Sequence, residues 1–248
     1  MKILVLGDTC EDVFCYGYSK RLCPESPVPV FIPKETTKNL GMATNVYENI
    51  VAIDNGVCEN MPLRSDINLF TNEALGSKTR YIDKVSNHMF LRVDTDDYDP
   101  CDKLPSDIEE YDLVVVSDYN KGFLRDRDLV EIAERSKLSF IDTKKDFNED
   151  WARTFDFIKI NEKEYLENGW KYKTENIVIT KAEKGCCFMD NNYPIKKPSE
   201  VRDVSGAGDT FLAGLSYSYA CLRDIDRAIN FAQECCQKVI QKKGVATV

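Results

Sequence analysis

Short runs rich in Val, Ile and Phe alternate along the chain with segments of helical character, and no other feature constrains the fold as strongly. Several runs end in Asp, Asn or Thr, as buried parallel strands do when their carboxyl ends carry functional groups. The pattern predicts a three-layer α/β fold with a mostly parallel central sheet and ligands at the carboxyl ends of its strands. The expected strands are Ile3–Leu6, Leu113–Val116, Ser139–Ile141, Phe157–Ile160 and Ile177–Thr180, and the expected helices are Ala43–Ile53, Arg125–Lys137, Glu162–Gly169, Asp209–Ala220 and Asp224–Lys242.

A proline-rich segment interrupts this alternation near the N-terminus. Residues Phe14–Lys34 hold four prolines among apolar side chains, and prolines restrict such a stretch to edge strands or extended arms. A second extended pair, Thr79–Asp83 and Met89–Asp94, flanks a polar turn that contains His88. We therefore expect a small β lid, formed from about 14–34 and 79–94, that projects from a single domain spanning residues 1–248. Such a lid either covers a ligand or contacts a second subunit to form a homodimer.

Charge and cysteine content exclude several classes of function. The formal net charge is −9 with no basic tract, which disfavours nucleic-acid binding. No apolar run approaches the ~18 residues that a membrane span needs. None of the ten cysteines forms a C-x-x-C pair and His88 is the only histidine, so zinc sites, multi-histidine metal sites and a disulfide framework are not expected. These observations predict reduced thiols and a cytoplasmic location.

The strongest chemical signal is Asp203–Phe211, DVSGAGDTF, which runs directly into an apolar helix. Small residues let a ligand approach the backbone closely, and the N–H groups of a helix start attract anions. A carboxylate is explained there if Asp209 is a general base that takes a proton from an attacking hydroxyl while the N–H groups hold a transferring phosphoryl group. The alternative is a tight turn permitted by Gly206 and Gly208, with Asp209 as a helix cap. Spacing alone leaves both interpretations open.

Dinucleotide binding is a weaker interpretation of the same glycines. Phe211 stands where a third glycine is expected, and the motif lies at the wrong end of the chain. The G-x-x-x-x-G-K-[ST] triphosphate loop is absent from the sequence. A dinucleotide-dependent oxidoreductase is therefore disfavoured.

The Asp203–Phe211 loop resembles the C-terminal signature of the ribokinase-like (PfkB) carbohydrate kinases. Asn161–Glu164 matches the family's N-x-x-E, Val178–Lys181 its nucleotide-side strand, and Gly185 the glycine that follows. Further stretches, collinear over nearly the whole chain, resemble the branch that phosphorylates D-glycero-D-manno-heptose 7-phosphate in ADP-heptose synthesis. They are Gly7–Gly17, Arg21–Val30, Ser117–Gly122, Ile141–Lys144 and Lys243–Val248.

This resemblance implies an ATP-dependent kinase that uses Mg²⁺ and leaves room for a monovalent cation. It makes Asp209 the catalytic base and the backbone of Gly206, Ala207 and Gly208 the anion hole. It also places Asn161 and Glu164 around Mg²⁺ through water. From local sequence alone, a helix N-cap and a solvated first-turn acid are the favoured interpretation of this pair. The residues implied beside the nucleotide are Thr180, Lys181 and Gly185.

On the substrate side the resemblance implies contacts to a sugar or sugar phosphate. Asp8 and Asp12 lie at and after the end of the first strand, where carboxylates suit sugar hydroxyls, although both also suit turn caps. Gly41 and Asn45 match part of the family's sugar-contacting G-G-x-x-N element. The cations available to a substrate phosphate are Arg21, Lys121, Lys144 and Arg92. Arg21 and Lys121 are supported best, because they lie within the Arg21–Val30 and Ser117–Gly122 stretches that resemble the heptose-phosphate branch.

Two departures from the family pattern put the substrate in question. Leu40 adds bulk where the family has the first of two paired glycines. The segment between Asn45 and Thr79 is short and shows no clear strand–helix unit. A catalytically weak relative that binds nucleotide or sugar as a regulator therefore stays open as a second hypothesis. The presence of Asp209 together with the N-x-x-E motif favours an active kinase.

Overall fold

An eight-stranded sheet runs through the main body of the computed structural model, which describes residues 1–57, 64–96, 98–168, 175–196 and 200–248. The strand order is β12-β11-β10-β9-β8-β7-β1-β4. The six strands β4, β1, β7, β8, β9 and β10 are parallel to one another. β11 and β12 follow at one edge in antiparallel orientation. Each of the five predicted strands is confirmed. The bounds are β1 Lys2–Gly7, β4 Asp66–Thr71, β7 Leu113–Asp118, β8 Ser139–Thr143, β9 Phe157–Asn161, β10 Ile177–Thr180, β11 Cys186–Phe188 and β12 Asn191–Tyr193.

Helices cover both faces of this sheet, as the alternation predicted. On one face lie α1 (Ala43–Ala52), α5 (Ala207–Leu222) and α6 (Ile225–Val239), and on the other lie α2 (Asp126–Arg135), α3 (Glu149–Ala152) and α4 (Glu162–Glu167). Short helical turns occur at Ile53–Val57, Ile108–Glu110 and Ala182–Lys184. The three-layer α/β architecture with a mostly parallel sheet is therefore confirmed.

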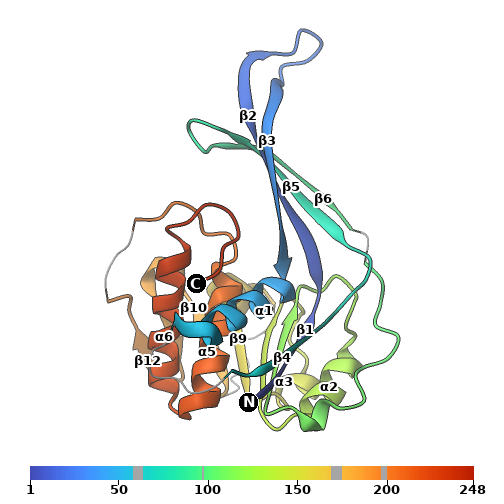
Figure 1. Ribbon diagram of the computed structural model, residues 1–248, viewed down its shortest axis with the longest axis vertical. Coiled ribbons are helices and arrows are strands. Elements are labelled where there is room, and N and C mark those ends of the chain that lie inside the picture. Colours follow the sequence, from blue (N-terminus) through green and yellow to red (C-terminus); the bar gives the residue numbers. More distant parts are fainter. Residues whose placement is uncertain (58–63, 97, 169–174, 197–199) are drawn as a thin grey trace.

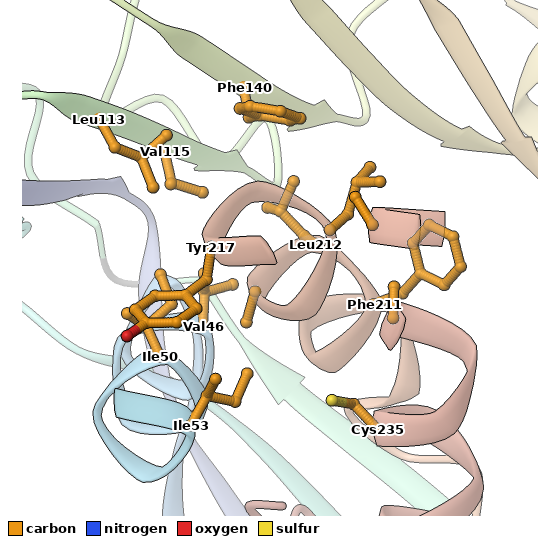
Figure 2. Packing of buried hydrophobic residues seen from close by; sticks show 14 of the residues in the cluster. Val46, Ile50, Ile53, Leu113, Val115, Phe140, Phe211, Leu212, Tyr217 and Cys235 are labelled. Carbon is orange, nitrogen blue, oxygen red and sulfur yellow. The ribbon is translucent and has the colours of Figure 1, made fainter. Parts of the chain in front are cut away.

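The two apolar cores follow from the two-residue period of a strand. In β7, Leu113 and Val115 point toward α1 and α5, whereas Val114 and Val116 point toward α2. Figure 2 shows the first core, where Leu212 and Tyr217 of α5 face the side chains of α1 and β7. This packing fixes α5 against the sheet, so the position of the helix start is set by the core beneath it.

The predicted β lid is present and longer than the sequence indicated. Its four strands are β2 (Thr9–Leu22), β3 (Pro29–Met42), β5 (Gly76–Asp83) and β6 (Met89–Thr95), in the order β3-β2-β5-β6. The lid projects far beyond the body (Figure 1). Pro29 and Pro33 lie in the edge strand β3, where a missing N–H is tolerated. His88 lies in the predicted turn, and its carbonyl accepts a hydrogen bond from the Asp83 N–H.

The segment between α1 and the lid corrects one expectation. Asp66–Thr71, which the sequence did not suggest as a strand, forms β4 at the sheet edge and pairs in parallel with β1. The chain then passes through residues 72–75 directly into β5, so no helix separates these two strands. Within this segment Asn68 lies in β4, whereas Asn60 and Pro62 lie outside the described residues.

Two of the expected absences can be compared with the structure. Among the described residues, no helix is long and apolar enough to cross a membrane. No disulfide joins any two of the nine described cysteines, and Cys58 lies outside the described residues.

Candidate functional site

The start of α5 places a carboxylate at the carboxyl edge of the sheet. Gly206 is the N-cap and has a φ of 78°, in the left-handed region that glycine enters at little cost. A Cβ at Gly206 would also lie only 2.7 Å from Asn45 Nδ2. The sharp turn puts Asp209 in the first helical turn, with 3% of the residue exposed.

Both oxygens of Asp209 accept hydrogen bonds from distant parts of the chain. The Tyr119 hydroxyl donates to Oδ1 at 2.8 Å and Asn45 Nδ2 donates to Oδ2 at 3.0 Å. Burial raises the pKa of Asp209 to about 6, against the opposing effect of these two donors. A carboxylate with a pKa near neutrality can take up a proton during a reaction and release it afterwards.

The backbone around Gly206 provides donors for an anion. The first intrahelical bond runs from Thr210 N to Gly206 O at 2.9 Å, so the N–H groups of Gly208 and Asp209 precede the helical ladder and have no intrahelical acceptor. The Ala207 N–H instead donates to Val204 O at 3.2 Å. Of the three residues predicted for the anion hole, Gly208 has an N–H without an intrahelical acceptor, and the N–H of Ala207 is engaged in the turn. Gly206 contributes the turn itself, and the N–H of Asp209 is a further donor that was not predicted from the sequence.

Asp8 holds the loop that carries Tyr119. Its Oδ2 accepts from the backbone N–H of Tyr119 at 2.6 Å and of Lys121 at 3.4 Å. Its Oδ1 is buried and has no hydrogen-bond partner among the described residues. Burial raises the pKa of this carboxyl. Asp8 thus caps a distant loop rather than its own turn, and one of its oxygens has no donor among the described residues.

Asp12 lies in β2, a strand of the lid. Its Oδ1 accepts from Arg80 Nη1 at 2.5 Å, and both side chains are largely buried. Its other oxygen lies against Gly41, where a Cβ would overlap it. Gly41 is therefore needed for the position of the Asp12 carboxylate, which is a physical reason for glycine at this point of the motif.

The predicted phosphate-binding cations lie in different parts of the molecule. Lys121 forms an ion pair with Asp96 at 2.5 Å and lies over the ring of Tyr98. Arg92 pairs with Asp94 on β6 and is half exposed. Arg21 is exposed near the outer end of β2, next to the hairpin tip. The structure therefore does not bring Arg21 together with Asp209 within one chain.

Asn161 and Glu164 form a capping box at the start of α4. Asn161 Oδ1 accepts from Glu164 N at 2.9 Å, and Glu164 Oε2 accepts from Asn161 N at 3.0 Å. The other carboxylate oxygen of Glu164 pairs with Lys144 Nζ at 2.6 Å. The N-cap interpretation is thus observed, and a role toward a metal stays a prediction.

A chain of charged side chains, buried at Asp142 and Lys159 and partly exposed at Lys144 and Glu164, connects this capping box to the start of α5. Lys144 Nζ lies 3.5 Å from Asp142 Oδ1, and Lys159 Nζ lies 2.6 Å from Asp142 Oδ2. Burial alone would raise the pKa of Asp142, but the two ammonium groups hold it below its usual value. A Cβ at Gly208 would meet Lys159 Nζ at 3.1 Å. The chain of charges therefore runs from Glu164 to the first turn of α5.

The nucleotide-side residues continue along the same edge. Thr180 is the register partner of Asn161, so the ends of β9 and β10 lie side by side. Lys181 N donates to Gly185 O at 2.7 Å. Gly185 has a φ of 89° and closes the turn between β10 and β11. Asn161, Thr180, Lys181 and Gly185 are thus brought to one end of the sheet.

The C-terminal segment closes the site on the lid side. Asp203 Oδ2 accepts from Gly244 N at 2.9 Å, and Asn39 Nδ2 donates to Val245 O at 2.7 Å. A Cβ at Gly244 would contact the ring of Phe14 in β2 at 3.5 Å. The DVSGAGD loop and the base of the lid are therefore held together by the end of the chain.

Sequence reasoning assigned no role to four side chains that shape this site. Tyr119 was noted only within a motif, Arg80 only within an expected strand, and Lys159 and Lys78 were not singled out. Lys78 Nζ lies 4.7 Å from the centre of the Tyr119 ring. The available signal was the position of the charges, since Lys159 stands between two isoleucines of β9 and Arg80 directly precedes Tyr81 and Ile82 in β5.

The comparisons with known proteins agree with this arrangement. Residues 143–248 match the pfkB family of carbohydrate kinases, so the resemblance stated above is confirmed. The bifunctional protein HldE of Nitratiruptor sp. is 30% identical over 292 residues, and that of Helicobacter hepaticus is 33% identical over 297. Each covers 99% of this chain, but the chain spans only 63% and 61% of their lengths.

Solved structures confirm the ribokinase-like fold. A ribokinase from Thermotoga maritima matches with a TM-score of 0.74 and 15% identity, covering 98% of this chain and 94% of its own. A ribokinase from Arabidopsis thaliana, solved with ribose and ATP, matches with a TM-score of 0.71 and 13% identity, covering 98% and 93% respectively.

Proposed function

We propose, from the premise that residues 143–248 belong to the pfkB carbohydrate kinases, that this protein transfers the γ-phosphoryl group of ATP to a hydroxyl of a sugar or sugar phosphate. The observation that carries the proposal is the Asp209 carboxylate, buried in the first turn of α5 beside free backbone N–H groups and held between Tyr119 and Asn45. Base chemistry gives a reason for a negative charge at an anion-binding helix start.

In the proposed reaction Asp209 takes the proton of the attacking sugar hydroxyl. The hydroxyl oxygen then forms a bond to the γ-phosphorus, the bond from that phosphorus to the bridging oxygen breaks, and ADP leaves. The two donors to Asp209, Tyr119 and Asn45, hold the carboxylate in one orientation. A fixed base that meets the hydroxyl in line with the phosphorus lowers the barrier through orientation.

The start of α5 stabilises the charge on the transferring group. The N–H groups of Gly208 and Asp209 point out of the first turn, and the positive end of the helix macrodipole favours negative charge there. The glycine at 208 leaves room for a phosphoryl oxygen to approach the backbone. Because these donors are positioned before the reaction, they need no reorganisation as charge develops.

Asn161 and Glu164 fit a Mg²⁺ ion held through water. Among the described residues there is no group of three or more acidic, Cys or His side chains that could ligate a metal directly. The capping box leaves lone pairs free on oxygens of both residues, and these can accept hydrogen bonds from metal-bound water. Mg²⁺ keeps several waters when it binds triphosphates, and when bound it neutralises phosphate charge.

On the nucleotide side the proposal assigns Thr180, Lys181 and Gly185 to ATP. Their support is the common edge that they share with Asn161. The monovalent cation rests on the family resemblance. Comparing ADP release in potassium chloride and in tetramethylammonium chloride tests it, and equal rates would remove the cation from the proposal.

Heptose 7-phosphate is the leading substrate candidate, supported by the HldE relatives and by the motifs of the first half of the chain. Asp12, held by Arg80 and Gly41, and the unpartnered oxygen of Asp8 are the acceptors proposed for sugar hydroxyls. Lys121, and with it Lys78 beside Tyr119, are the cations proposed for the substrate phosphate. Gly41 and Asn45 contribute by positioning Asp12 and Asp209.

We further propose a homodimer through the lid and a cytoplasmic location. The lid strands expose Ile32, Leu91 and Val93, and exposed apolar edge strands tend to pair or aggregate unless they are covered. A second copy would cover them and could also carry Arg21 toward a neighbouring site. Light scattering at micromolar protein tests the dimer, and a strict monomer would contradict it.

A coupled ADP-release assay over a panel of hexose and heptose phosphates tests the function. Asp209→Asn should lower kcat by ~10²–10⁴-fold and leave ADP binding intact. The matched control is Asp224→Asn, which changes an N-cap aspartate of α6 and should leave turnover unchanged because Asn caps equally well. No ADP release with any sugar, together with retained nucleotide binding, would favour the regulator hypothesis.

A further inference from the structure

Lys159 is a buried ammonium with a single acceptor. Only 3% of the residue is exposed, and its strand position points toward α5 rather than toward the apolar core formed by Ile158 and Ile160. Among the described residues its one hydrogen-bond acceptor is Asp142 Oδ2, at 2.6 Å. A lysine ammonium has three N–H donors, so two of them have no protein acceptor in this part of the chain.

The ammonium faces the first turn of α5. A Cβ at Gly208 would lie 3.1 Å from Lys159 Nζ, which places the charge beside the peptide groups that form the anion hole. The positive end of the helix macrodipole is at the same place. Two positive groups close together in a buried site are unfavourable unless a negative group joins them.

Asp142 is shared between Lys159 and a second ammonium group. The same carboxylate also lies near Lys144 Nζ, which in turn pairs with Glu164. Asp209 is nearby, but its two oxygens accept from Tyr119 and Asn45. The spare donors of Lys159 and the N–H groups at the start of α5 thus converge on one small region, as an anion site requires.

We propose that Lys159 is a catalytic residue whose ammonium donates to an oxygen of the transferring phosphoryl group at the start of α5. This inference rests on the proposed kinase function and assigns it a further residue. Negative charge on the phosphoryl oxygens meets Lys159 from the side of Gly208, while Asp142 keeps the ammonium in place. Such a contact strengthens as the bond to ADP breaks, so it acts mainly on kcat.

A purely structural role for Lys159 is separable from this one. Lys159→Met removes the ammonium but leaves Asp142 buried with one fewer partner, which by itself destabilises a protein. The double variant Lys159→Met/Asp142→Asn removes both charges of the pair and keeps similar side-chain volumes. A lysine that serves only to neutralise Asp142 is no longer needed in the double variant.

The experiment measures kcat and two affinities for wild type and both variants. The probes are ADP alone and ADP with aluminium fluoride, each with Mg²⁺, because fluoroaluminate mimics a transferring phosphoryl group. We expect both variants to lose about 10²-fold in kcat and in affinity for ADP with fluoroaluminate, with the affinity for ADP alone nearly unchanged. Circular dichroism checks folding, and the double variant decides the question if the single variant does not fold.

Recovery of kcat and of fluoroaluminate affinity in the double variant would overturn the inference, since it would make Lys159 a counterion only. Equal loss of affinity for ADP with and without fluoroaluminate would also overturn it. Failure of the kinase proposal looks different: wild type itself would release no ADP with any sugar and would gain no affinity from fluoroaluminate.

Discussion

The hydroxyl of Tyr119 donates to Asp209 Oδ1 at 2.8 Å, although the two residues lie 90 positions apart in the chain. Tyr119 follows β7 and its backbone is held by Asp8, so the end of the central strand is linked to the start of α5. Burial and the neighbouring Asp209 carboxylate raise the pKa of Tyr119 well above its usual value. The phenol therefore stays protonated and remains a donor to the proposed base.

Replacing Tyr119 by Phe should shift the acid limb of the profile of kcat/KM against pH to higher pH. The hydrogen bond favours the charged form of Asp209, so its loss raises the pKa of Asp209 above the present value of about 6. A hydrogen bond of ~1 kcal/mol corresponds to a shift of roughly 0.7 pH units. The measurement is kcat/KM against pH for wild type and Tyr119→Phe.

A matched control for this shift is Tyr193→Phe. Tyr193 lies in the edge strand β12 and donates to Asp226 of α6, so the control removes the same kind of bond from a carboxylate other than Asp209. Its profile should coincide with that of the wild type. An unshifted limb in Tyr119→Phe would show that the limb does not report Asp209.

Asp209→Asn should stabilise the fold near neutral pH. The folded-state pKa of Asp209 is raised, to about 6 from 3.8, so the folded state binds this proton more tightly than the unfolded chain. The ionised group therefore destabilises the fold above about pH 6, and this penalty disappears below about pH 4. We expect a gain on the order of 1–3 kcal/mol at neutral pH and none in acid. Urea unfolding at both pH values measures it, and an equal gain at both would contradict the titration of Asp209.

The start of α5 was predictable because its residues are contiguous. Gly206, Gly208 and Asp209 lie within four positions, so a local motif carries the helix start, the proposed anion-binding backbone and the proposed base together. The strands were predictable for a similar reason, since apolar runs such as Leu113–Val116 report burial directly. β4 was missed because Asp66 and Asn68 place polar side chains within an edge strand that is only partly buried.

Contacts between distant segments could not be read from the sequence. Tyr119 with Asp209, Arg80 with Asp12 and Lys159 with Asp142 each depend on strand register and on the position of a helix. The motif around Arg21 suggested a substrate contact, but the length of β2 carries that side chain to the outer end of the lid. A sequence motif therefore identifies a residue but does not tell how far its side chain lies from the rest of the site.

Gly41→Ala should impair binding of the sugar more than binding of ATP. A Cβ at this position overlaps the Asp12 carboxylate, so Asp12 must move away from the sugar hydroxyls that it is proposed to bind. Displacement of a positioning group by ~1 Å can cost on the order of 10²-fold in rate. Steady-state kinetics should show a higher KM for the sugar and an unchanged KM for ATP. Thr36→Ala, in the outer part of the same strand, is the control, and equal effects of both variants would refute the role of Gly41.

Lys121→Ala should discriminate between phosphorylated and unphosphorylated sugars. Lys121 Nζ is partly exposed and its partner Asp96 is largely exposed, so the ammonium can exchange that carboxylate for a substrate phosphate at little cost. A charge-assisted contact contributes ~1.5–3 kcal/mol, or roughly ten- to a hundredfold in affinity. The KM for the sugar phosphate should rise by that factor while the KM for ATP stays the same. Arg92→Ala, which breaks the comparably exposed pair with Asp94, is the matched control. The contrary outcome is that neither Lys121→Ala nor Arg92→Ala changes the KM for the sugar phosphate relative to the KM for the unphosphorylated sugar. If unphosphorylated sugars are also equally good substrates, the protein is a plain sugar kinase and the heptose-phosphate proposal is wrong.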